Sequence, residues 1–280
     1  MSNQSWDRII EPKKSWFSLD LRELIKHKDL LFLFFKRDVV SVYKQTILGP
    51  VWFFVQPIIT SLVFTLIFGN MAKISTDGLP AFLFYLTGMT LWNYFASTVT
   101  NNANIFGANQ TVFGKVYFPR LLVPMSNILA NLLKFSLQFI IFIGVWEYYV
   151  YNGSVVANSY ALLLPINLVF TSFMGLGIGL ILSSYTVKYR DLNFLVGFGV
   201  QLLMYGSSII FPLSIVSEKL RNILQLNPMT NLIECTKKGF LGKGIIDTPH
   251  LIYSYVLCTI ILFIGMLLFN KKETTFIDTV

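Results

Sequence analysis

Six apolar segments constrain this chain more than any other feature of its sequence. The hydrocarbon core of a bilayer is about 30 Å thick, so a helix needs roughly 20 apolar residues to cross it. Helices are suited to this task because they satisfy their own backbone hydrogen bonds. The predicted fold is an all-α integral membrane protein with six transmembrane helices. We place these spans at Pro50–Phe68, Ala81–Val99, Ser126–Tyr148, Ala161–Ser183, Leu192–Phe211 and Leu251–Phe269.

The composition agrees with a membrane location. The chain is 54% hydrophobic and 13% charged, whereas soluble domains have about 25% charged residues. The first 28 residues contain no apolar core of a signal peptide, so we expect no cleaved leader. The net charge of +8 needs no nucleic-acid partner, because cytosolic loops of membrane proteins are rich in Lys and Arg.

The distribution of basic residues predicts the orientation. With the N-terminus in the cytosol, the cytosolic segments carry fifteen Lys and Arg and the external segments carry six. Positive residues favour the cytosolic side, so we expect both termini there. The predicted organisation is a cytosolic segment over 1–48, a six-helix domain over 49–270 and a cytosolic tail over 271–280.

An amphipathic stretch precedes the first span. Residues 20–36 place apolar side chains near one helical face and charges on the rest, which is typical of a helix lying on a membrane surface. An ordinary flank of the first span is the alternative. The apolar positions are Leu21, Leu24, Ile25, Leu31 and Phe35.

The external segment over 212–250 holds two amphipathic stretches too short to span, Ser214–Leu226 and Thr230–Leu241. Asn227 and Pro228 separate them, since Pro cannot continue the first helix. Pro is tolerated in the first turn of the second helix, and Asn227 is a good N-cap for it. Two short helices around a breaker predict a re-entrant hairpin that dips into the outer leaflet. An external loop with two surface helices is the alternative.

Several kinds of chemistry are missing from the sequence. Gly114 and Lys115 resemble part of a phosphate-binding loop, but the spacing is wrong and Val116 replaces the Ser or Thr that holds magnesium. The spans contain few ionisable groups: Lys134 and Glu147 lie in the third span, where snorkelling toward the interface is the simpler interpretation. We therefore expect no bound cofactor or metal, no enzymatic activity, and an energy source outside this chain.

Two helical stripes combine aromatic and polar side chains. Sugars stack on aromatic faces, so these stripes suit a glycan conduit, although Phe also faces lipid and Tyr and Trp gather at interfaces. The second span contributes Phe82, Tyr85, Met89, Trp92, Phe95 and Val99. The fifth contributes Phe194, Phe198, Gln201, Tyr205 and Ser208. In the fourth span, Gly175, Gly177 and Gly179 predict close helix packing.

Four motifs in order along the chain carry a resemblance to a known family. The first comprises Arg37-Asp38, Tyr43-Lys44-Gln45-Thr46, Leu48-Gly49, Trp52 and Pro57. The others are Lys115-Val116-Tyr117-Phe118-Pro119-Arg120 with Pro124, then Tyr189-Arg190-Asp191, then Asn227-Pro228-Met229-Thr230. Together they resemble the ABC-2 type permeases that export O-antigen, capsule and wall teichoic acid across the bacterial inner membrane.

The resemblance implies partners. Two copies of such a permease form the pore, and two copies of a separate cytosolic ATPase bind ATP and magnesium beneath it. It implies that the ATPase contacts Lys115, Phe118, Pro119, Arg120, Tyr189, Arg190 and Asp191. It also implies that the hairpin around Asn227 and Pro228 is an external gate.

The implied substrate is a glycan on an undecaprenyl diphosphate carrier. Its entrance would lie at Leu48 and Gly49, where Lys36, Arg37 and Lys44 supply cations for the diphosphate. Alternatively, Arg37 and Asp38 pair with neighbours and hold the helix turn. The nearest competing function is an ABC-2 permease for a drug or a small lipid. A membrane-embedded transferase fits less well, because it should show a cluster of Asp, Glu or His at one membrane face and the sequence shows none. A channel or scaffold also fits less well, because it would not explain the two cytosolic docking loops.

Overall fold

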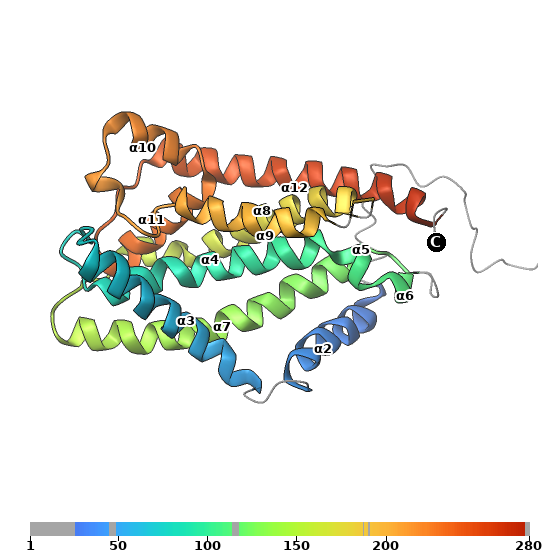
Figure 1. The fold of residues 1–280 in the computed structure, drawn as a ribbon, viewed down its shortest axis with the longest axis horizontal. Helices are drawn as coiled ribbons and strands as arrows, with labels where there is room; N and C mark the ends of the chain where they lie inside the picture. The colour runs from blue at the N-terminus through green and yellow to red at the C-terminus, as the bar shows by residue number, and fades with distance from the viewer. Residues whose placement is uncertain (1–25, 45–48, 114–117, 187, 190, 278–280) are drawn as a thin grey trace, which may run out of the picture.

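The computed structural model describes residues 26–44, 49–113, 118–186, 188–189 and 191–277, and within these ranges it is helical, with no strand. The long helices run along a common axis (Figure 1). They are α3 (Trp52–Phe64, continued as a π-helix over Thr65–Met71), α4 (Ala81–Ala103), α7 (Leu122–Tyr151), α8 (Leu164–Thr186), α9 (Leu192–Tyr205) and α12 (Thr248–Ile277). Shorter helices are α2 (Lys28–Lys44), α5 (Ile105–Ala108), α6 (Gln110–Phe113), α10 (Glu218–Gln225) and α11 (Pro228–Leu241).

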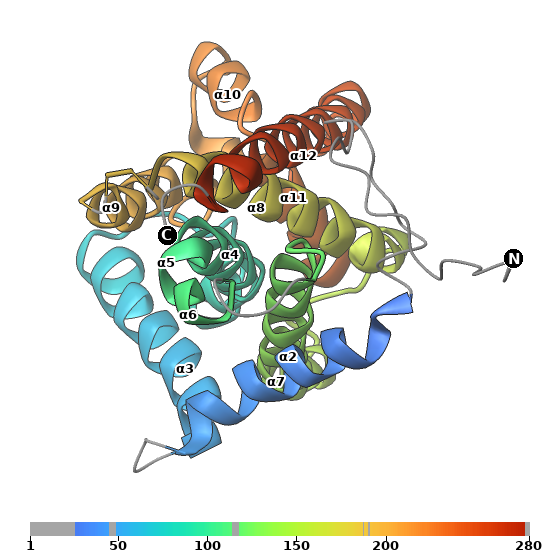
Figure 2. The same ribbon diagram turned by 90° about the vertical axis from the view of Figure 1, so that its right-hand side faces the viewer.

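The two ends of the bundle carry different elements. Helices α2, α5 and α6 lie toward one end with the C-terminal part of α12, and α10 lies at the other end (Figure 1). Viewed along the bundle, α2 crosses the end obliquely beside α7 (Figure 2). Segments that the sequence analysis places on one side of a membrane therefore share one end of the molecule.

Helix α4 lies at the centre of the bundle and packs against α3, α7, α8, α9 and α11. Residues 83–92 of α4 are all buried, so no face of this half of the helix meets solvent. Its threonine side chains bond within the helix: the Oγ1 atoms of Thr87 and Thr90, for example, each donate to the carbonyl four residues earlier, at 2.7 Å. Such bonds satisfy polar groups that hydrocarbon cannot.

Four helical segments in the described residues are long and apolar enough to cross a membrane: Trp52–Met71, Leu122–Tyr151, Ser159–Thr186 and Thr248–Lys271. Each overlaps a predicted span. The predicted second and fifth spans differ from these four. Helix α4 has the length but is less apolar than these four. Helix α9 ends at Tyr205, six residues before the predicted Phe211, with Gly206 as its C-cap. Six membrane crossings therefore stay a prediction.

The predicted surface helix over 20–36 is shifted in the structure. Helix α2 begins at Lys28 and continues to Lys44, whereas residues 20–25 lie outside the described part. Helix α2 packs against α7, and its buried Phe34 ring lies 5.3 Å from the ring of Phe118 in the loop before α7. Gly49, just before α3, adopts a φ of +50°, a left-handed conformation that glycine adopts most readily.

Glycines in α8 allow close approach on two sides, as predicted. A Cβ atom on Gly179 would lie 2.6 Å from the Asn102 Cβ of α4, and one on Gly177 would lie 2.7 Å from the Ile261 carbonyl of α12. On α12, a Cβ atom on Gly265 would lie 2.5 Å from the Gly177 carbonyl. The helix therefore packs backbone to backbone against α4 and α12, as small residues permit.

Candidate functional site

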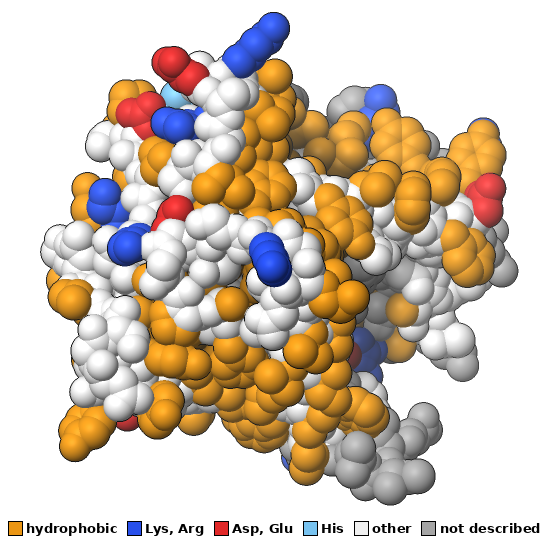
Figure 3. All heavy atoms as spheres, turned by 60° about the vertical axis from the view of Figure 1, so that its left-hand side comes forward, with side chains coloured by type: hydrophobic (Ala, Val, Ile, Leu, Met, Phe, Trp, Pro, Cys, Tyr) orange, Lys and Arg blue, Asp and Glu red, His pale blue; other side chains and the backbone are white. Residues whose placement is uncertain are grey.

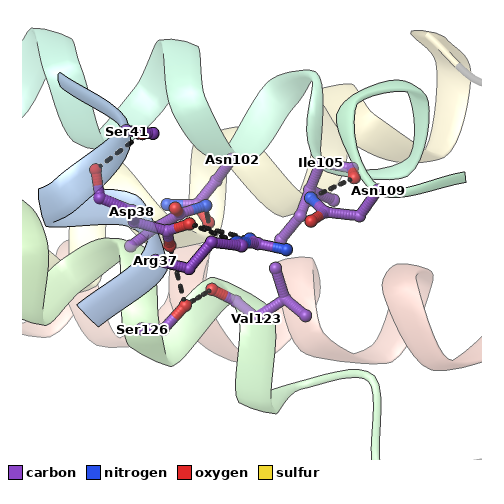
Figure 4. A network of polar contacts seen from close by, with 9 residues as sticks. Arg37, Asp38, Ser41, Asn102, Ile105, Asn109, Val123 and Ser126 are labelled. Carbon is purple, nitrogen blue, oxygen red and sulfur yellow. Dashed lines mark hydrogen bonds and ion pairs between the residues drawn. The ribbon is translucent and has the colours of Figure 1, made fainter. Parts of the chain in front are cut away.

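The first candidate region is the contact between α2 and α7 (Figure 4). Arg37 donates from Nε and Nη2 to Oδ1 of Asp38, at 2.9 and 2.7 Å. The other oxygen of Asp38 accepts from the Ser126 hydroxyl of α7 at 3.1 Å. The Arg37 guanidinium also lies over the Phe34 ring, 4.9 Å from its centroid. The ion pair therefore connects α2 to the third predicted span.

The other predicted entrance residues surround this pair. Lys36 and Lys44 are exposed on α2, and Gly49 follows at the start of the first span. Leu48 lies outside the described residues. The predicted entrance therefore includes two solvent-exposed lysines on α2 and a glycine in a left-handed conformation just before α3. The entrance for a lipid diphosphate stays a prediction, whereas the contact between Arg37 and Asp38 is the one that the alternative predicts.

The predicted ATPase contacts lie at the same end but differ in exposure. Phe118 and Arg120 are buried, and the Arg120 guanidinium lies 5.4 Å from the Phe113 ring centroid. The Pro119 carbonyl accepts a hydrogen bond from the amide of Leu122, the first residue of α7. These residues thus anchor the loop before α7.

Other residues of this loop and the next are on the surface. Tyr189 and Asp191 are exposed beside the start of α9. Gln110 and Thr111 of α6 are exposed as well, opposite the buried Phe113. Lys115 and Arg190 lie outside the described residues. A docking partner would meet α6 and the turn before α9 here, since both segments face outward at one end of the bundle.

The two aromatic stripes occupy different environments. Tyr85, Trp92 and Phe95 pack inside the chain, where none is more than 3% exposed, and Phe82 is partly buried. They are core residues of the single chain, because α4 is surrounded by other helices. On α9, by contrast, the predicted residues are exposed: Phe198, Gln201 and Tyr205.

Two of the larger cavities in the described part of the chain lie beside α4. An apolar one of about 300 Å³ separates α4 from α9 and is lined by Phe95, Val99, Val196 and Leu203 among others. A polar one of about 270 Å³ lies between α3, α4 and α7. Neither cavity is lined by the exposed Phe198 or Tyr205 of α9, whereas Phe95 and Val99 of α4 line the apolar one.

The opposite end of the bundle holds the predicted gate. Asn227 caps α11 as predicted, since its Oδ1 accepts from the Met229 amide at 3.1 Å and Pro228 follows in the first turn. The Asn227 amide also donates to the Ser207 hydroxyl at 3.1 Å. Helix α10 is largely exposed while α11 is almost entirely buried. Charged side chains gather over this end, and hydrophobic ones cover the flank beside it (Figure 3).

A buried ion pair lies within α11 and was not predicted. Lys237 Nζ is 3.5 Å from Glu234 Oε1, and both side chains are at most 2% exposed. Nζ also donates to the Ser208 carbonyl and lies 3.7 Å from the Phe84 ring centroid. Burial lowers the pKa of Lys237 to about 8, although Glu234 and Asp77 favour its charged form. The pair ties α11 to the turn after α9 and to α4.

Comparison with known protein families shows which family this chain belongs to. Residues 29–241 match the ABC-2 type transporter family, which is more than half of the chain. The chain belongs to the ABC-2 type transporter family. The match includes α2, the predicted entrance, both loops at the α2 end and the whole of α10 and α11.

Individual relatives of this ABC-2 chain cover nearly its full length. The O-antigen export system permease protein RfbA of Klebsiella pneumoniae is 27% identical over 250 residues, covering 89% of this chain and 94% of the relative. RfbA of Myxococcus xanthus is 25% identical over 268 residues, covering 93% and 98%. The capsule polysaccharide export inner-membrane protein CtrC of Neisseria meningitidis serogroup A is 20% identical over 253 residues, covering 88% and 92%.

Some polar residues of this ABC-2 chain had no sequence signal that could assign them a partner. Asp38 and Ser126 are 88 positions apart, and Lys237 reaches the carbonyl of Ser208, 29 positions away. For Glu234 and Lys237 a local signal existed, because opposite charges three positions apart lie on one helical face. Only the fold shows that this face is buried.

Proposed function

We propose that this chain is the transmembrane subunit of an ATP-driven exporter that moves a lipid-linked polysaccharide across the bacterial inner membrane. The observation that carries the proposal is the near full-length similarity to permeases named for O-antigen and capsule polysaccharide export. The proposed substrate is a glycan on an undecaprenyl diphosphate carrier.

The proposed topology has six crossings with both termini in the cytosol. In it, α4 and α9 cross with the four apolar helices, and α10 and α11 form a re-entrant hairpin at the external end. Supporting this, α11 is buried among α4, α8 and α12 and is not free on the surface. The buried threonines and Asn102 of α4 fit a crossing shielded from lipid by its neighbours, because polar residues in spans face the protein interior.

The proposed assembly is a homodimer with two copies of a cytosolic ATPase. The ATPase would dock on the α2 end, against α6 and the turn at Tyr189 and Asp191, and ATP and magnesium would bind to it alone. The exposed aromatic face of α9, with Phe198, Gln201 and Tyr205, would face the glycan between the two copies. Aromatic faces accept sugars of different identity, which suits a polymer in motion.

Export of a drug or small lipid is the competing function within the same family. The two functions predict different results when the chain is tested by complementation. Expressed with its own ATPase in a bacterium that lacks its O-antigen permease, the chain should restore surface polysaccharide, as seen by gel electrophoresis of the extracted glycolipid. Restored resistance to a drug without surface polysaccharide would favour the competing function.

The ion pair between Arg37 and Asp38 leads to the first mutational prediction. Because Arg37 donates twice to Asp38 and Asp38 binds Ser126, we expect Arg37→Ala to lower export several-fold while the ATPase still assembles. If Arg37 acts through this pair, Asp38→Asn should lower export to the same degree. A loss confined to Arg37→Ala would instead assign Arg37 to the phosphate of the substrate, and normal export by both variants would contradict both roles.

A further inference from the structure

The polar cavity between α3, α4 and α7 has no place in the proposed function. Its volume is about 270 Å³, against roughly 30 Å³ for one water in the liquid. It therefore has room for several waters or for a small polar group together with a few waters. Polar side chains from three helices line it: Gln56, Asn93, Ser97, Thr100, Asn131, Lys134 and Gln138.

Several of these polar groups are without a protein partner. Gln138 is 9% exposed, and its side-chain amide makes no hydrogen bond with any described residue. The amides of Asn93, which is partly buried, and of Gln56, which is exposed, likewise make no hydrogen bond with a described residue. The Lys134 ammonium lies 5.7 Å from the centroid of the Phe53 ring. Buried polar groups are normally paired, so the Gln138 amide in this cavity is open to a partner that the described residues do not supply.

The electrostatics of the cavity favour an anion. Its described lining contains one cation, Lys134, and no carboxylate. Asp38 of α2 is an acidic group whose charge acts on Lys134. Asp38 is already paired with Arg37 and bonded to Ser126, as Figure 4 shows. Lys134 is therefore left as the positive charge at this site.

The position of the cavity suits a lipid headgroup. Lys134 follows Ser126 by eight residues of α7, about 12 Å along the helix axis, so it lies above the contact with α2. Gln56 is exposed and Lys134 is partly exposed, so the cavity opens to the surface between α3 and α7. This is the bilayer-facing side of α3, whose Ile59, Leu62 and Leu66 are exposed. A lipid of the leaflet beside α2 can reach it laterally.

We propose that this cavity binds the phosphate group of an acidic lipid from the leaflet on the α2 side. Lys134 supplies the charge, and the amides of Gln138, Asn93 and Gln56 donate to the phosphate oxygens. Charge-assisted hydrogen bonds to phosphate are the stronger class of hydrogen bond. The phosphate belongs to a bulk phospholipid or to the carrier of the substrate, and the assay below separates these sources.

The test measures lipid binding by the purified full chain in neutral detergent, with native mass spectrometry. The probes are phosphatidylglycerol, undecaprenyl diphosphate without glycan, and neutral phosphatidylcholine. We expect Lys134→Gln to weaken binding of an acidic probe roughly tenfold, and Lys134→Arg to retain it. Lys219→Gln removes the same charge from the exposed α10 at the opposite end and should bind as the unmodified chain does.

Each outcome bears on the proposal. Lys134-dependent binding of phosphatidylglycerol identifies a phospholipid site, and Lys134-dependent binding of undecaprenyl diphosphate alone identifies a substrate site. Gln138→Leu should also weaken binding, with the charge still present, because it removes a buried donor. Equal binding of both acidic probes by the unmodified chain and Lys134→Gln would overturn the proposal, whatever the export assay shows, and would leave water as the occupant.

Discussion

Replacing Lys237 with Met is expected to destabilise the folded chain by about 3–5 kcal/mol, since it leaves Glu234 as a buried charge without its partner. The two side chains are 3.5 Å apart and at most 2% exposed. Met fills a similar volume, so the loss reflects the unpaired carboxylate and the lost contact with the Ser208 carbonyl more than a cavity. Thermal unfolding in detergent should show a fall in Tm of roughly 10 °C.

The double variant Lys237→Met with Glu234→Gln is the matched control. It removes both charges, and the Gln side chain can still accept from the Ile245 amide that now donates to Glu234 at 3.1 Å. Buried ion pairs are often replaceable as a pair at little cost. We therefore expect most of the stability to return. A double variant as unstable as the single one would contradict the ion-pair explanation.

Gly265→Leu is expected to prevent α8 and α12 from packing as they do. A Cβ atom at this position would lie 2.5 Å from the Gly177 carbonyl oxygen and 2.9 Å from its Cα. Both are backbone atoms, so a rotamer change cannot relieve the clash. Overpacking in a core usually costs 1–3 kcal/mol, and a clash with backbone should reach or exceed about 3 kcal/mol. The yield of monodisperse protein on size-exclusion chromatography measures the loss.

Gly144→Leu on α7 is the control for this substitution. Gly144 is helical and exposed, and nothing lies within 4 Å of an added Cβ atom. Leu is also the better helix former, by several tenths of a kcal/mol. The yield of this variant should match or exceed that of the unmodified chain. If Gly265→Leu gives the same yield as Gly144→Leu, close packing at Gly177 is not needed for folding.

The sequence predicted the long helices well because length and apolar composition report membrane crossing directly. Helix α7 extends only four residues before and three after the predicted Ser126–Tyr148. The prediction was less accurate for α9, which ends at Tyr205, because the apolar run continues past Gly206 into a turn. It was also less accurate for α2, whose continuation to Lys44 depends on packing against α7.

Functional residues whose role depends on local sequence were also predicted better than those whose role depends on the fold. The cap at Asn227 and the close packing at Gly177 are local features, and both were predicted and are confirmed. The burial of Trp92 was not predicted, since a stripe on one helical face does not say whether lipid, water or another helix covers it. The polar cavity at Lys134 depends on three helices that meet only in the fold.

ATP-dependent export tests the central proposal most directly. The chain and its own ATPase are reconstituted in vesicles with an undecaprenyl diphosphate-linked glycan in the membrane. Arrival of the glycan at the opposite face is followed by its accessibility to an added glycosidase. We predict that the glycan crosses only when this chain, the ATPase and ATP are all present. No crossing under these conditions, together with ATP-dependent movement of a drug or small lipid by the same vesicles, would contradict it.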